Sequence, residues 1–334
     1  MKNKILKSSL CCALCLLIFI LAGCSKDNPM KSTEEDLRVV GSVGEFDVLY
    51  EELRFLALTY KASLVDTYGA DIFNDPQAAD KYESEMREYI YQNITANYAI
   101  LKMCREVGIE ADEQAFSDAV EREIESIIDS LGGKKSYKSF LRENFMTDNF
   151  FRFNTRVNKM KSELFYVYTD DLELIETEND NIYEIIKKEF VRTQHIYISK
   201  SNGKSYDENR ALIEDAYSRA QNGEDFFSLA SKYSEDEELT ADGFYIVKGY
   251  MSEQYENVAF SLSENGMSGI IEDDSGFYII KRLELDSVYI MMNFETLSDR
   301  YQQYTFLSMI DDVQKELEFV PNDFLKNINL LEIE

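Results

Sequence analysis

His195, the only histidine among 334 residues, is the first residue whose type suggests chemistry. It lies in the segment TQHIYIS, residues 193–199, whose alternation predicts a short strand. Ile196 and Ile198 would share one face, with His195, Tyr197 and Ser199 on the other. Imidazole titrates near neutral pH, so it often acts as an acid or a base. A lone histidine can equally be a buried hydrogen-bonding group, and its neighbours must decide.

Several other kinds of catalytic site find no support in the sequence. It contains no phosphate-binding loop, no G-x-S-x-G elbow and no zinc-ligand spacing. With one histidine and one cysteine expected to stay free, Cys104, a transition-metal site is not expected. The residue counts permit a Ser-His-Asp triad, but nothing in the sequence places one.

The N-terminal sequence is typical of an export signal. A basic start, MKNKILK, precedes an apolar run over residues 10–22, which is shorter than the roughly 20 residues that span a bilayer. The run ends in Leu21-Ala22-Gly23-Cys24, which resembles a bacterial lipobox. We therefore expect a signal peptide over 1–23, lipidation of Cys24 and a polar tether over 24–37. The alternative is an ordinary signal peptide or membrane anchor with a chance cysteine.

Charge and cysteine content limit the class of protein. Cys11, Cys12 and Cys15 would leave with the signal peptide and Cys24 would be lipidated, so the mature chain would have no internal disulfide. An exported chain without disulfides needs a sizeable core for its stability. The net charge is −28, and removal of the signal lowers Lys+Arg from 35 to 32 against 63 acids, which gives −31. Nucleic acid is not an expected partner, because phosphate binding requires basic surface.

The chain is expected to be α+β with an inserted domain. A β-like segment with turn points at Gly41 and Gly44 comes first, and Tyr50 opens a helical region that extends to residue 189. Its amphipathic faces are core, or form a groove for apolar client segments. Residues 190–286 follow a β-α-α-α-β order, in which Ser205 and Glu208 fit a capping box. The helical tail, 287–334, would pack on the N-terminal domain.

Three blocks of the middle segment resemble parvulin-type peptidyl-prolyl isomerases. They are QHIYISK, NGEDFFSLASKYSED and KGYMSEQYENVAFSLSENGMSGIIEDDSGFYIIKR, within residues 190–286. The whole layout is similar to PrsA-type extracytoplasmic foldases and SurA-like chaperones, which have a helical N-terminal domain completed by a C-terminal helix and carry a small α/β parvulin-like insert. The resemblance implies isomerisation of X–Pro bonds, a slow reaction that needs neither a metal nor a cofactor.

The resemblance also implies site residues. His195 matches the histidine of the first strand, and Asp236 matches the Cys or Asp of the S-x-D/C segment. Met251 matches the methionine of the G-x-M turn, and Tyr255 matches an aromatic, usually Phe, four residues later. Met251 and Tyr255 would seat the proline ring, together with Phe244.

Two departures from the family pattern bear on turnover. Tyr278 stands where a second histidine usually forms a hydrogen bond with the first, so it is the expected partner of His195. Ser275 matches a polar position just before the same strand. The Gly-rich stretch before the methionine is reduced to residues 240–244, which would reshape the rim of the site.

Two functions follow, and a third is held open. The first is a membrane-anchored foldase that isomerises X–Pro bonds in unfolded or partly folded exported proteins. The second is a non-catalytic holdase chaperone with a degenerate parvulin domain. The third, a solute-binding lipoprotein, would require two lobes of repeated βα units. Paired helical N-terminal regions would be compatible with a homodimer.

Overall fold

The computed structural model describes residues 31–74, 76–111, 114–273 and 275–334. The expected signal peptide and Cys24 lie outside these residues. The end of the expected tether is described, and it packs on the folded body. Ser32 donates a 2.7 Å hydrogen bond to Glu51, and Asp36 forms an ion pair with Arg54 at 3.3 Å.

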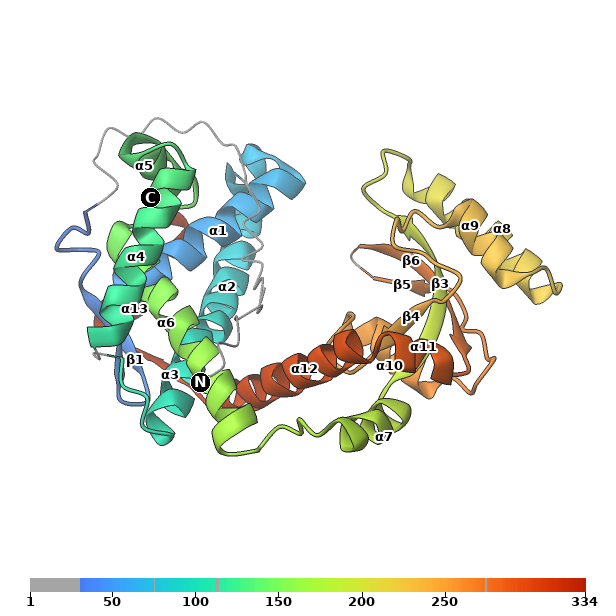
Figure 1. The fold of residues 1–334 in the computed structure, drawn as a ribbon. Coiled ribbons are helices and arrows are strands. Elements are labelled where there is room, and N and C mark those ends of the chain that lie inside the picture. Colours follow the sequence, from blue (N-terminus) through green and yellow to red (C-terminus); the bar gives the residue numbers. More distant parts are fainter. Residues whose placement is uncertain (1–30, 75, 112–113, 274) are drawn as a thin grey trace. The chain divides into compact units, whose positions relative to one another are not determined.

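Two compact units divide the described chain, one of residues 31–164 and 313–334, the other of residues 165–312. The first unit is mainly helical (Figure 1). Its elements are β1 (Val39–Val43), β2 (Phe46–Leu49), α1 (Tyr50–Tyr68), the 3₁₀ helix η1 (Ala70–Asn74), α2 (Pro76–Asn93), α3 (Ala96–Glu106), α4 (Gln114–Ser130), α5 (Lys134–Glu143), most of α6 (Asp148–Tyr166), β7 (Phe319–Pro321), α13 (Asp323–Lys326) and η3 (Leu330–Glu332).

The first unit joins the two ends of the chain in one antiparallel sheet of order β2-β1-β7. Gly44 has a φ of 56° and forms the β1–β2 turn, as expected. Gly41 is not a turn residue: it lies within β1, where a Cβ would come within 2.5 Å of Phe319 and Val320. A glycine is needed there because β7 approaches so closely.

The second unit contains the residues expected to do chemistry. Its elements are η2 (Val167–Asp171), α7 (Asn179–Glu189), β3 (Val191–Ser199), α8 (Tyr206–Gln221), α9 (Phe226–Tyr233), β4 (Phe244–Ile246), α10 (Glu253–Ser261), β5 (Ile271–Glu272), β6 (Gly276–Leu283), α11 (Ser287–Met292) and most of α12 (Phe294–Lys315). The strands form an antiparallel sheet of order β4-β3-β6-β5. The expected α+β class is confirmed, and two short strands, β4 and β5, add to the expected order.

The two faces of this sheet have different partners. Ile196 and Ile198 of β3 pack with Phe277 and Ile279 of β6 under α8 and α9, which lie together beside the sheet (Figure 1). Residues of odd number on β3, including His195, face the other way, where α10 packs. The alternation read from the sequence is therefore confirmed, and one face of the sheet is left to position polar groups.

The middle unit extends further along the chain than the expected 190–286. Ile182 and Ile186 of α7 are fully buried against Tyr245, and Ile290 and Leu297 complete the same cluster. This apolar contact ties residues 165–189 and 287–312 to the middle unit. Only the last part of the expected tail, residues 313–334, belongs to the N-terminal unit.

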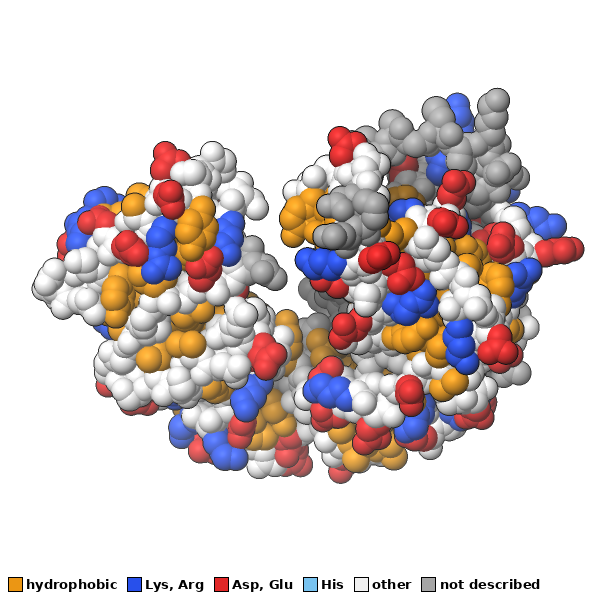
Figure 2. Space-filling model, turned by 180° about the vertical axis from the view of Figure 1, so that it is seen from behind, with side chains coloured by type: hydrophobic (Ala, Val, Ile, Leu, Met, Phe, Trp, Pro, Cys, Tyr) orange, Lys and Arg blue, Asp and Glu red, His pale blue; other side chains and the backbone are white. Residues whose placement is uncertain are grey.

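The surface carries both signs of charge. Red acidic side chains are interspersed with blue basic ones and small orange hydrophobic areas on the face drawn in Figure 2. In the parts of the chain that the structure describes, no helix is both long enough and apolar enough to span a bilayer.

Candidate functional site

His195 lies in the middle of β3 with its side chain 1% exposed. Both ring nitrogens have partners. Nε2 lies 2.8 Å from Oδ2 of Asp236, and Nδ1 lies 3.0 Å from the hydroxyl of Tyr255. The imidazole stacks on Phe244 at a centroid separation of 4.7 Å and an angle of 4°. At this burial the ring has almost no surface of its own for a ligand to contact.

Asp236 follows α9 in a segment that is hydrogen-bonded to the end of β3. The amide of Glu235 donates to the carbonyl of Tyr197 at 2.8 Å, and the amide of Tyr197 donates to Oγ of Ser234 at 3.1 Å. One oxygen of Asp236 receives the amide of Glu238 at 2.8 Å, while the other faces His195. The side chain of Asp236 remains 23% exposed, so it can meet a ligand.

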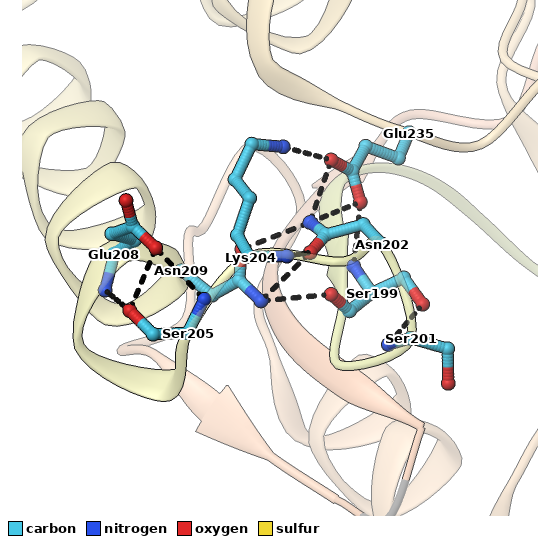
Figure 3. A network of polar contacts seen from close by, with 8 residues as sticks. All are labelled: Ser199, Ser201, Asn202, Lys204, Ser205, Glu208, Asn209 and Glu235. Atoms are coloured by element: carbon cyan, nitrogen blue, oxygen red, sulfur yellow. Dashed lines mark hydrogen bonds and ion pairs between the residues drawn. The ribbon is translucent and has the colours of Figure 1, made fainter.

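A polar network on the loop after β3 supports this segment (Figure 3). The carboxylate of Glu235 accepts from the amide of Ser199 at 2.9 Å, from Asn202 at 2.8 and 3.0 Å and from Nζ of Lys204 at 3.0 Å. Asn209, 1% exposed, donates to the carbonyl of Ser199 at 3.1 Å. The network thus ties the residue before Asp236 to the start of α8.

The start of α8 is the expected capping box. The hydroxyl of Ser205 accepts from the amide of Glu208 at 3.3 Å, and the carboxylate of Glu208 accepts from the amide of Ser205 at 2.8 Å. These paired bonds satisfy amides that the first helical turn leaves free. They fix the end of the loop that carries Asn202 (Figure 3).

Phe244 and Met251 supply half-buried apolar surface to the cluster that contains Tyr255. Gly243 allows Phe244 to reach His195: its φ is 69°, and a Cβ there would lie 2.4 Å from the carbonyl of Thr193. Met251 sits in the turn before α10, where Glu256 accepts from its amide at 2.9 Å. The structure therefore brings all three expected substrate-binding residues, Phe244, Met251 and Tyr255, into one apolar cluster.

Tyr255 is 2% exposed, so its ring offers little surface for a proline. It lies in the first turn of α10, whose N-cap, Ser252, accepts from the amide of Tyr255 at 3.4 Å. Its hydroxyl lies 3.0 Å from both Nδ1 of His195 and Oγ1 of Thr193. Thr193 was not among the residues expected at the site, although the alternation of β3 places it on the same face as His195.

Tyr278 was expected to form a hydrogen bond with His195, but in the structure its hydroxyl has another partner. Its ring meets the imidazole edge-on, with centroids 5.9 Å apart, and stacks on Tyr197 at 4.7 Å. Its hydroxyl instead lies 2.9 Å from Oγ of Ser275. The strand register is the reason: Tyr278 pairs with Tyr197 in the β3–β6 ladder, whereas the residue opposite His195 is Ile280. Ser275 also donates to Asp273 at 2.6 Å, away from His195.

The sequence profile of the PPIC-type PPIASE domain matches residues 181–285. This range includes β3, β6 and all the expected catalytic and substrate-binding residues. The chain carries a PPIC-type PPIase domain. It is similar to the foldase protein PrsA of Caldanaerobacter subterraneus subsp. tengcongensis, with 26% identity over 64% of this chain and 62% of that one.

The chain is also similar to two further proteins. The foldase protein PrsA of Geobacillus kaustophilus is 22% identical over 71% of this chain and 80% of that protein. The solved structure of PrsA from Streptococcus pneumoniae is 19% identical, with a TM-score of 0.32 over 88% of this chain and 98% of that one. The chain spans about 62% of the length of the first two curated relatives that it matches.

The electrostatics of the PPIase domain favour a charged Asp236. The hydrogen bond from His195 is the main reason that the pKa of Asp236 lies below its ordinary value, and burial opposes this effect only in part. Burial raises the pKa of both Tyr255 and Tyr278, so both phenols are neutral at physiological pH. Among the described residues, no group of three or more His, Cys, Asp or Glu side chains is placed to hold a metal ion.

Proposed function

We propose that this protein is a membrane-anchored extracytoplasmic foldase whose PPIase domain accelerates cis–trans isomerisation of X–Pro bonds in unfolded or partly folded exported proteins. The observation that carries the proposal is the constellation at His195: a partly exposed carboxylate, Asp236, bound to a buried imidazole on which Phe244 stacks. The similarity to foldase proteins supports the same conclusion.

The chemistry of the reaction matches these groups. The planar amide is stabilised by a resonance form with negative charge on oxygen and positive charge on nitrogen, and the rotation barrier is about 20 kcal/mol. A fixed carboxylate near the carbonyl oxygen opposes that form, so Asp236 would favour the twisted amide. His195 keeps this charge in place. No covalent bond is made or broken.

Apolar surface supports the same step. The half-buried side chains of Met251 and Phe244 would contact the proline ring and exclude water from the amide. Water stabilises the polar planar amide more than the twisted one, so its removal lowers the barrier. Because Tyr255 is buried, the proline seat is assigned to Met251 and Phe244, with the edge of Tyr278 at its side.

Location and anchoring belong to the proposal. The lipobox resemblance of residues 21–24 supports a lipid on Cys24 and a place on the outer face of the membrane. Clients would then be met as they leave the membrane. Labelling with a radioactive fatty acid, in the chain and in a Cys24→Ala variant, would test the anchor; equal labelling of both would contradict it.

A second candidate is a holdase that binds clients without isomerising them. The observation in its favour is Tyr278, which occupies the position of the family's second histidine and bonds Ser275 instead of His195. NMR exchange spectroscopy on short X–Pro peptides, with the full chain in detergent, separates the two candidates. Acceleration that falls in Asp236→Ala and Met251→Ala supports the foldase. No acceleration by a folded chain that still suppresses aggregation supports the holdase.

A further inference from the structure

Two tyrosines meet the ring of His195 edge-on. The centroid of Tyr255 lies 5.6 Å from that of His195 at an angle of 83°, and the centroid of Tyr278 lies 5.9 Å away at 85°. Their hydroxyls differ in what they reach. That of Tyr255 lies 3.0 Å from Nδ1 of His195, whereas that of Tyr278 lies 2.9 Å from Oγ of Ser275.

We propose that Tyr255 is a positioning residue that holds His195 and, through it, Asp236. The hydroxyl that orients His195 thus comes from α10, not from Tyr278 as the family resemblance implied. The chain of contacts runs Thr193–Tyr255–His195–Asp236, with separations of 3.0, 3.0 and 2.8 Å. Its consequence for catalysis rests on the proposed function, but the arrangement of its protons does not.

The hydrogens of this chain can be placed by counting donors and acceptors. Asp236 is ionised and can only accept, so Nε2 of His195 carries a proton. In the neutral imidazole Nδ1 is then an acceptor, and the hydroxyl of Tyr255 donates to it. The oxygen of Tyr255 in turn accepts from Thr193. Each contact thus has one donor and one acceptor. In the other neutral tautomer, unprotonated Nε2 would face the carboxylate of Asp236, and two acceptors would repel each other.

The same chain also accommodates a charged imidazole. Nδ1 then donates to the oxygen of Tyr255, whose hydroxyl turns to donate to Thr193. Two hydroxyl rotations suffice, and no heavy atom moves. Tyr255 therefore holds the ring of His195 in either charge state, which a phenylalanine at this position would not do.

Burial makes the hydroxyl of Tyr255 hard to replace. Thr193 is 0% exposed, His195 1% and Tyr255 2%. Without that hydroxyl, Nδ1 would be a buried polar atom without a partner, because bulk water does not reach it. The imidazole would then keep only its hydrogen bond to Asp236 and would rotate more freely. Asp236 would be less well oriented as a result.

The single histidine makes the test direct. In the full chain labelled with ¹⁵N-histidine, the imidazole resonances come from His195 alone. We expect the wild-type neutral form to carry its proton on Nε2. Tyr255→Phe should move the Nδ1 resonance toward that of an unbonded imine nitrogen. Tyr278→Phe removes the hydroxyl of the other ring that meets His195 edge-on, and it should leave the resonance in place. In peptide exchange, Tyr255→Phe should lower kcat about tenfold with little change in KM.

Three results would overturn the proposal: a wild-type neutral proton on Nδ1, an unmoved Nδ1 resonance in Tyr255→Phe, or equal shifts in the two phenylalanine variants. If Tyr255→Phe does not fold, Thr193→Val tests the same chain, and its Nδ1 resonance should shift in the same direction by a smaller amount. Failure of the foldase proposal looks different. The wild type would then accelerate no peptide exchange while the nitrogen resonances behave as described.

Discussion

Nε2 of His195 lies 2.8 Å from Oδ2 of Asp236, and this bond joins a histidine that is 1% exposed to a carboxylate that is 23% exposed. Asp236 is thus the charge that the buried network can present to a substrate. Asp236→Asn keeps the shape and removes the charge, so we expect a loss of about tenfold or more in peptide isomerisation, measured by NMR exchange. Glu237→Gln removes a neighbouring exposed acid and serves as the control; an equal loss there would contradict a specific role for Asp236.

The stability that this bond supplies should depend on pH. The hydrogen bond with His195 holds the pKa of Asp236 below its ordinary 3.8, so the folded state favours the ionised carboxylate. That contribution is present above pH 3.8 and is lost as the pH falls through the lower, folded pKa. Urea unfolding should find Asp236→Asn less stable than wild type at pH 7, with the difference shrinking below pH 3.8. A difference that grows on acidification would contradict the assignment.

A second pH effect should come from Glu52 in the N-terminal unit. Burial raises the pKa of Glu52 to about 7, although the amide of Leu49 and the hydroxyl of Tyr98 donate to it. The folded state therefore prefers the protonated acid. The stability is full below the ordinary pKa of 4.5 and falls as the pH rises to about 7.

Glu52→Gln should therefore gain about 1–3 kcal/mol over wild type in the free energy of unfolding between pH 5 and pH 8. Chemical denaturation at the two pH values measures it. Tyr98→Phe is the control of opposite sign, because it removes a donor to the ionised carboxylate and should steepen the loss. Parallel pH curves for wild type and Glu52→Gln would show that Glu52 is ionised without penalty.

Restoring the family's second histidine should do little by itself. In Tyr278→His the new imidazole would meet a His195 whose Nδ1 is already bonded to Tyr255. We expect Tyr278→His to change peptide isomerisation less than threefold, and the double variant Tyr255→Phe/Tyr278→His to recover activity that Tyr255→Phe loses. A double-mutant cycle on kcat measures the coupling. A large gain from Tyr278→His alone would mean that the site had simply lost its second imidazole.

The network in Figure 3 should matter for both stability and activity. Glu235 accepts hydrogen bonds from Ser199, Asn202 and Lys204, so Glu235→Ala should destabilise the chain by about 1–2 kcal/mol and lower isomerisation by displacing Asp236. Glu214→Ala breaks an exposed helix pair with Arg210 and should cost less than about 0.5 kcal/mol. Thermal unfolding and peptide exchange measure both variants. Unchanged activity in a destabilised Glu235→Ala would separate the network from the site.

Much of the PPIase domain could be read from local patterns. The alternation at Ile196 and Ile198, the capping box of Ser205 and Glu208, and the position of His195 in a strand depend on neighbours within four residues. The strands β4 and β5 were not found, because three and two residues are too few to show a period. The compact unit, 165–312, is longer than the expected 190–286, because α7 and α12 join it through contacts distant in sequence.

By itself the sequence determined the residue types at the site and the face of β3 on which His195 lies, since both follow from composition and a period of two. Only the tertiary structure decided which hydroxyl reaches His195. Tyr255 and Tyr278 carry the same group and meet the same ring edge-on. The choice between them depends on which hydroxyl lies within hydrogen-bond distance of Nδ1, and that of Tyr255 does, at 3.0 Å. Helix packing and strand register set that distance, and both arise from contacts across 60 residues or more of chain.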